Sequence, residues 1–124
     1  MSRHVAVWLD HHEAKIFHVT AESFEEEHLK APHASLRHRE KSHPAEMKHF
    51  FDDIAHALES AEEILFVGPG SAKLELVKYL HEHKKGLVPK IVGVETADHP
   101  HDRQIVAHAR AYFDKVDRMK GNVD

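Results

Sequence analysis

The sequence ILFVGPGSAKLELVKYL, residues 64–80, contains an apolar run, a Gly-Pro-Gly turn and a helical pattern in immediate succession. Residues 64–67 are continuously apolar, which is typical of a short strand buried on both faces. After the turn, Leu74, Val77 and Leu80 recur at helical spacing. The stretch therefore predicts a buried strand and then a helix whose Leu74, Val77 and Leu80 face the core.

Strands are also predicted upstream of this unit, at residues 5–9, 14–21 and 23–30, because each segment is short and rich in strand-forming residues. Residues 10–12, Asp-His-His, form the turn between the first two, so these should pair as a hairpin. The third strand carries three consecutive glutamates, residues 25–27, which suit an exposed sheet edge.

Two more helices and one more strand complete the pattern. Ser42 is a candidate cap and Pro44 a first-turn residue for a helix, whose apolar face comprises Met47, Phe50, Phe51, Ile54 and Leu58. Gly86 should end the helix that follows the Gly-Pro-Gly turn, and Pro89 should prevent its resumption. Residues 91–94 predict a third apolar strand. The apolar side of the last helix comprises Ile105, Val106, Ala109, Tyr112, Phe113 and Val116.

The element order is therefore βββαβαβα. Strands separated by helices should be parallel, and the first three should form an antiparallel meander. This predicts an α/β, ribonuclease-H-like three-layer fold: a mixed five-stranded sheet of order 3-2-1-4-5 with helices on both faces. Residues 1–119 should form a single domain and residues 120–124 a frayed tail.

The composition excludes several kinds of site and of protein. There is no cysteine, so disulfides, thiolate nucleophiles and Cys-containing zinc sites are excluded. No stretch approaches a membrane span and the N-terminus has no signal-peptide pattern, which favours a cytoplasmic protein. The formal net charge of −4 argues against nonspecific coating of nucleic acid. The 15 histidines are unusual. Most are expected on solvated faces, but because histidine titrates near neutrality they could also serve a pH-responsive interaction domain.

Polar segments should converge at one edge of this sheet. The parallel strands point their carboxyl ends to the same edge, where open α/β sheets usually carry their site. One segment is Gly68, Gly70, Ser71 and Lys73, in which a glycine turn, free helix N–H groups and a lysine could hold an RNA phosphate. The alternative is a simple strand-to-helix turn with a capping serine. The spacing is not that of a Walker A loop.

The same edge should collect carboxylates and imidazoles. These belong to Asp10, His11, Asp98, His99 and His101, which could bind zinc or manganese in a metal-dependent phosphodiester hydrolase. A solvated loop is the alternative for this set. The strand at residues 64–67 ends in glycine with no carboxylate beside it, which weakens the hydrolase hypothesis.

The segment Gly68-Pro69-Gly70-Ser71-Ala72-Lys73, at a strand end that opens a helix, resembles the middle domain of the archaeal and eukaryotic peptide-chain release factor and of its paralogue Pelota. The resemblance covers residues 5–116 and is most specific at residues 64–80, with a weaker match at residues 91–95. Bacteria have stand-alone relatives of such domains, often labelled translational machinery proteins, and this chain looks like one of them.

The resemblance implies a scaffold for contact with the ribosome or RNA. In the release factor, the loop before the first helix carries the Gly-Gly-Gln motif for peptide release. The corresponding residues 31–43 contain neither glycine nor glutamine, so catalysis does not carry over. Pelota has a basic loop there, which Arg37, Arg39 and Lys41 echo. The leading hypothesis is therefore a non-catalytic protein, without cofactor, that binds ribosomal RNA or tRNA through Arg37, Arg39, Lys41 and the Gly-Pro-Gly turn.

Overall fold

The computed structural model describes residues 4–31 and 44–121, and the side chains from residue 47 onward in the second range. Its strands are β1 (His4–Leu9), β2 (Glu13–Val19), β3 (Phe24–Lys30), β4 (Glu63–Gly68) and β5 (Ile91–Thr96). Its helices are α1 (Pro44–Ala57), α2 (Ala72–His83), a short 3-10 helix η2 (Lys85–Lys90) and α3 (Asp102–Met119). Ser42, the predicted cap of α1, lies outside the described residues.

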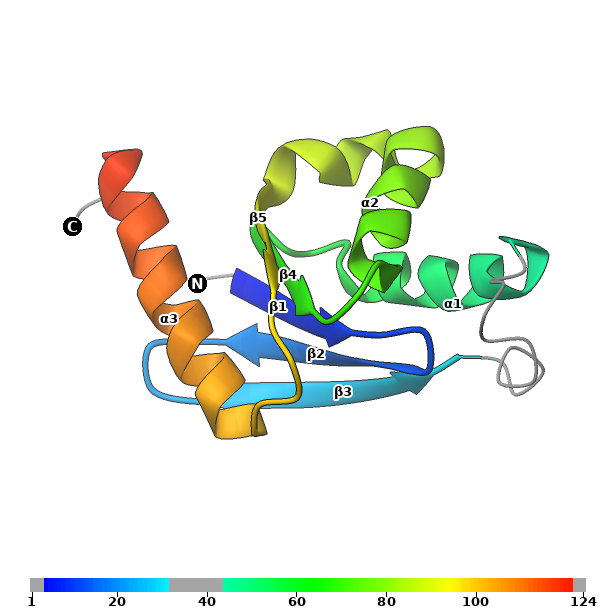
Figure 1. The fold of residues 1–124 in the computed structure, drawn as a ribbon. Coiled ribbons are helices and arrows are strands. Elements are labelled where there is room, and N and C mark those ends of the chain that lie inside the picture. The colour runs from blue at the N-terminus through cyan, green and yellow to red at the C-terminus, as the bar shows by residue number, and fades with distance from the viewer. Residues whose placement is uncertain (1–3, 32–43, 122–124) are drawn as a thin grey trace.

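The five strands form one sheet of order β3-β2-β1-β4-β5, which confirms the predicted topology (Figure 1). β1 pairs antiparallel with β2 and parallel with β4, and β5 is parallel to β4. In the central pair, His4 lies opposite Glu63 and Trp8 opposite Val67. The carboxyl ends of β1, β4 and β5 therefore reach the same edge of the sheet.

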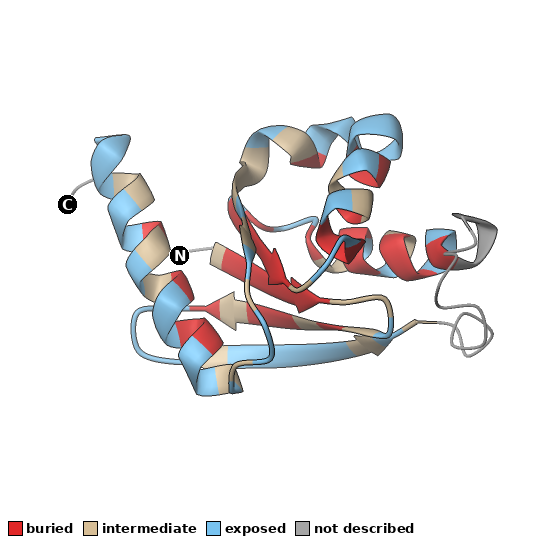
Figure 2. Cartoon of the chain, in the orientation of Figure 1, coloured by how far each residue is buried: buried red, intermediate tan, exposed pale blue. Residues whose placement is uncertain are grey.

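Helices cover both faces of the sheet, as predicted, because the central strands are apolar on both sides (Figure 2). On one face, alternate residues such as Val7 and Phe66 pack against α1 and α2. On the other face, Ala6, Trp8 and Leu65 pack against α3. Only one side of each helix is buried, as expected for helices that cover a sheet.

The two edges of the sheet differ from its centre. β3 is exposed along most of its length, including Glu25, Glu26 and Glu27, as its charged pattern predicted. β5 extends two residues beyond the predicted residues 91–94 and is only partly buried, with Val94 36% exposed. It lies at the opposite edge of the sheet, where β4 is its one neighbouring strand among the residues that the structure describes. In the parts of the chain that the structure describes, no helix combines the length and the apolarity needed to cross a bilayer.

The inward face of α2 differs from the prediction. Leu74 is 57% exposed and Val77 half-buried, while Leu80 is buried as predicted. The buried residues of this helix are Ala72, Lys73, Leu76, Tyr79 and Leu80. Two overlapping apolar stripes occur in its sequence, and packing selects the one that places the Tyr79 ring 5.6 Å from Phe51 of α1. The helix ends at His83, and Gly86 and Pro89 lie in η2.

The contact between α1 and α2 should make the protein sensitive to alkali. The Tyr79 hydroxyl donates a hydrogen bond to Asp52 Oδ1, and burial, reinforced by this carboxylate, raises the pKa of Tyr79 from 10.0 to about 12. Below pH 10 the phenol is protonated in both the folded and unfolded states. Between the two pKa values the unfolded state alone loses its proton, so the free energy of unfolding should fall by about 1.4 kcal/mol per pH unit.

Urea unfolding at several pH values between 9 and about 12 tests this expectation. Tyr79→Phe is the matched control, because it keeps the ring and removes the titrating group. The variant should lose less stability than the wild type over this range. The same pH slope in both proteins would contradict the assignment.

Candidate functional site

Three backbone contacts bring the polar segments together at the carboxyl edge of the sheet. Gly68 lies so close to the end of β1 that a Cβ there would stand 2.1 Å from the Leu9 carbonyl oxygen. The Ala97 N–H, just after β5, donates to the Gly68 carbonyl at 3.1 Å. The Ala31 N–H, just after β3, donates to the His12 carbonyl at 2.8 Å. The segments that follow β1, β3, β4 and β5 therefore share one edge.

The Gly-Pro-Gly turn starts α2. Gly70 has a φ of 61°, a left-handed conformation that favours glycine. Ser71 occupies the N-cap position, but its hydroxyl does not cap the helix, because its backbone is already helical (φ −105°, ψ −5°). Its Oγ instead donates to Glu75 Oε2 at 3.0 Å. His11 Nε2 lies 3.0 Å from the same carboxylate oxygen, so an acidic group stands at the start of α2.

Lys73 stabilises the turn from inside. Its side chain is only 3% exposed, and Nζ donates to the Gly70 carbonyl at 2.6 Å. The ammonium group therefore satisfies a backbone acceptor of the turn. A direct contact of Lys73 with a phosphate, as the sequence suggested, would require the side chain to leave this position.

The Asp and His residues of the predicted metal set lie along the same edge. Their histidines contact carboxylates mainly in pairwise ion pairs. Asp10 Oδ1 accepts hydrogen bonds from the backbone N–H groups of His12 and Glu13, at 2.8 and 2.9 Å, and so fixes the turn after β1. Nε2 of His99 lies 3.8 Å from Asp10 Oδ2, and its Nδ1 lies 3.0 Å from Asp98 Oδ1. The role of this set in metal binding stays a prediction.

His101 starts the last helix. Its backbone N–H donates to Gln104 Oε1 at 2.8 Å, and its carbonyl accepts from the Gln104 N–H at 2.9 Å. This reciprocal pair fixes the first turn of α3 at the rim of the same edge.

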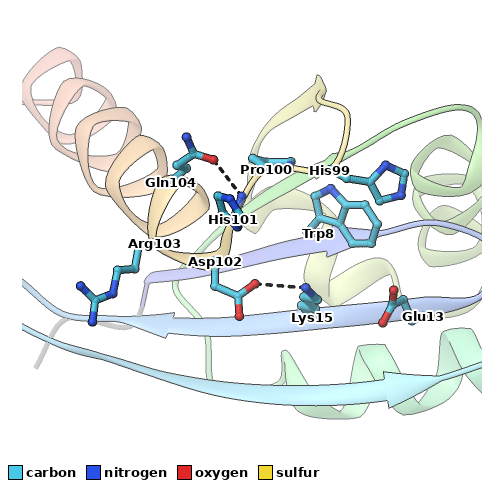
Figure 3. Close-up of a pocket in the computed structure, with 9 residues that line it drawn as sticks. All are labelled: Trp8, Glu13, Lys15, His99, Pro100, His101, Asp102, Arg103 and Gln104. Carbon is cyan, nitrogen blue, oxygen red and sulfur yellow. Dashed lines mark hydrogen bonds and ion pairs between the residues drawn. The ribbon is translucent and has the colours of Figure 1, made fainter.

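A pocket of about 750 Å³ opens between the start of α3 and the sheet (Figure 3). It is lined by Trp8, Glu13, Lys15, His99, Pro100, His101, Asp102, Arg103 and Gln104. The Trp8 indole N–H donates to the Asp98 carbonyl at 2.8 Å. The His99 ring lies 5.0 Å from the indole, measured between centroids. The lining thus combines the Trp8 indole with imidazole, cationic and carboxylate side chains.

Lys15 and Asp102 form an ion pair in this pocket. Lys15 Nζ lies 3.1 Å from Asp102 Oδ1, and this hydrogen bond raises the pKa of the lysine against the opposing effect of burial. Partial burial, together with Asp102, raises the pKa of Glu26 on the adjacent strand. Sequence reasoning missed Trp8, Lys15 and Arg103 as lining residues. The available signal was the placement of Trp8 at the carboxyl end of the first strand.

Most of the histidines that the structure describes are exposed, as expected, and many contact acidic groups. None of the described histidines is buried. Those within ion-pairing distance of a carboxylate are His4, His11, His18, His28, His56, His99 and His108. The basic residues Arg37, Arg39 and Lys41 lie outside the described residues. Their segment follows Ala31, which is bonded to the turn after β1, and precedes α1.

Comparisons with known proteins identify structural relatives. A scan against protein-family models found no match, and a search of curated proteins found none either. Among solved structures, the Pelota protein of Thermoplasma acidophilum aligns at a TM-score of 0.61 and 22% identity over 80% of this chain. Pelota of Archaeoglobus fulgidus aligns at 0.69 and 19% identity over 96%. The archaeal translation termination factor aRF1 aligns at 0.58 and 16% identity over 95%.

The match concerns one part of larger proteins. This chain covers 29% of the Thermoplasma Pelota structure, 33% of the Archaeoglobus one and 39% of aRF1. At these identities the likeness establishes the fold. The resemblance to a release-factor and Pelota domain is therefore confirmed at the level of the fold.

Proposed function

We propose that this chain is a non-catalytic, cytoplasmic, translation-associated protein that binds ribosomal RNA or tRNA through the carboxyl edge of its sheet. The observation that carries the proposal is its fold, which it shares with Pelota and with an archaeal protein described as a translation termination factor. Fold alone is a weak warrant for function, so the proposal also depends on the chemistry of the edge.

The groups at this edge suit a phosphate backbone. The start of α2 presents backbone N–H groups. Exposed side chains lie at the end of β3 (Lys30), in the turn after β1 (His12) and at the start of α3 (Arg103). Ala31, which precedes the sequence segment with Arg37, Arg39 and Lys41, is hydrogen-bonded to the turn after β1. The Glu75 carboxylate at the start of α2 would repel a phosphate. We therefore assign the main contribution to RNA affinity to the segment with Arg37, Arg39 and Lys41. Such contacts position RNA without reading its sequence.

We do not expect this chain to catalyse peptide release. Residues 31–43, which take the place of the release-factor loop, contain neither glycine nor glutamine. The Gly-Gly-Gln chemistry therefore has no counterpart in this chain. Binding without catalysis is what the remaining groups support.

Binding of labelled tRNA and of purified ribosomal subunits, measured over a range of salt concentrations, tests the proposal. Replacement of Arg37, Arg39 and Lys41 by Glu should weaken binding strongly. It should also reduce the magnitude of the slope of log affinity against log salt concentration by about two to three. Each phosphate contact that is lost means that fewer counterions are released from the RNA on binding.

The matched control replaces Lys78, Lys84 and Lys85, which are exposed on α2 and just after it, by Glu. It changes the net charge equally but lies away from the carboxyl edge. This variant should retain most of the wild-type affinity. Equal losses in the two variants would show that net charge, and not the basic segment, governs binding, and would contradict the proposal.

A further inference from the structure

A second polar cluster lies where β1 and β4 begin, at the opposite end of these strands from the carboxyl edge. It lies under the last turn of α3. His4 begins β1 and lies opposite Glu63, which begins β4. Both face α3, because they continue the alternation of Ala6 and Leu65, which pack on that helix. Asp117 follows Phe113 by one helical turn on the buried stripe of α3. Three positions where the pattern calls for apolar residues thus carry an imidazole and two carboxylates.

The three side chains converge closely. His4 Nε2 lies 3.1 Å from Asp117 Oδ2 and 3.4 Å from Glu63 Oε1. One ligand atom from each residue lies within 4.8 Å of the others, and no other group of three or more such residues does so among the side chains of residues 4–31 and 47–121. The His4 ring packs 4.7 Å from the Phe113 ring, which restricts its orientation.

Among the residues that the structure describes, two buried carboxylate oxygens in the cluster have no hydrogen-bond donor. They are Glu63 Oε1 and Asp117 Oδ1, and Glu63 as a whole is only 7% exposed. A buried acceptor without a partner destabilises the folded state, and two adjacent carboxylates repel each other. A cation between them would relieve both costs.

We propose that His4, Glu63 and Asp117 form a binding site for a divalent first-row metal ion of the Mn²⁺ or Zn²⁺ type. An imidazole nitrogen and two carboxylate oxygens are ligands that both ions accept. Three protein ligands leave positions for water. The ion would tie the starts of β1 and β4 to the end of α3, three segments distant in sequence. The site is separate from the Asp and His residues at the carboxyl edge.

Lys120 is the natural competitor of the metal. Its Nζ lies 3.5 Å from Glu63 Oε2, and its side chain is 49% exposed, so the ammonium can move into solvent. In the absence of metal it supplies part of the positive charge that the carboxylates need. Its removal should therefore tighten metal binding.

Titration of tag-free protein with Mn²⁺, followed by electron paramagnetic resonance of the free ion, tests the site. Mn²⁺ is chosen because it is the weakest first-row binder of isolated imidazoles, of which this chain has many. We expect one Mn²⁺ per chain and an upward shift of the melting temperature. Glu63→Gln and Asp117→Asn should each weaken binding by at least about tenfold, and Lys120→Met should strengthen it.

The control variant is His28→Gln. His28 and Glu13 form an exposed pair, 2.5 Å apart, that belongs to no group of three ligands among the described residues. This variant should bind Mn²⁺ like the wild type. The proposal fails if Glu63→Gln and Asp117→Asn, shown to be folded by circular dichroism, bind Mn²⁺ as the wild type does. It also fails if the wild type binds none at millimolar concentration, which would leave the cluster as an ion-pair network only.

Discussion

Gly68→Ala is expected to destabilise the protein by about 3 kcal/mol, at the upper end of the cost of inserting a methyl group into a packed site. The new Cβ would stand 2.1 Å from the Leu9 carbonyl oxygen, and a backbone atom cannot be displaced without moving the strand. Gly68 ends β4 while Leu9 ends β1, so the collision would separate the two central strands at the carboxyl edge. The turn that starts α2 would move with them.

Chemical denaturation, compared with Gly86→Ala, measures this effect. Gly86 lies in η2, where a Cβ would meet no atom within 4 Å. This control should change the free energy of unfolding by less than about 0.5 kcal/mol. Equal stability of Gly68→Ala and the wild type would mean that β1 and β4 do not approach each other as closely as described.

Leu76→Ala should cost about 2–5 kcal/mol, as for other buried leucines, whereas Leu74→Ala should leave stability within about 0.5 kcal/mol of the wild type. Leu76 is fully buried between α2 and the sheet, and Leu74 is 57% exposed. Both variants make the same chemical change on the same helix. Their difference therefore reports the rotation of α2 about its axis.

Thermal and urea unfolding of the two variants provide the measurement. Circular dichroism of the folded states checks that helix content is kept. A larger loss in Leu74→Ala than in Leu76→Ala would restore the orientation that the spacing of Leu74, Val77 and Leu80 predicts, and would contradict the one described.

The strand order was predictable because the local signals agree with one another. Residues 5–9 and 64–67 are apolar without interruption, so they belong in the centre of the sheet. The glutamates of β3 place that strand at an edge. The rotation of α2 about its axis was not predictable, because Leu74 and Leu76 both fit an apolar stripe. The contact of Tyr79 with Phe51 decides between the two.

The candidate site was predictable only as a location. Parallel strands place their carboxyl ends together, so the convergence of the turns after β1, β4 and β5 follows from topology. The role of Lys73 did not follow, because a lysine at a helix start resembles an anion ligand until its burial is known. The cluster of His4, Glu63 and Asp117 was beyond sequence reasoning, since 113 residues separate its ends.

Sedimentation of ribosomes from a lysate of cells that express this protein, first at low and then at high salt, tests the central claim most directly. The proposed function predicts that the protein migrates with a ribosomal subunit at low salt and is released at high salt, because its contacts are with phosphates. A protein that stays in the soluble fraction at both salt concentrations would contradict ribosome binding.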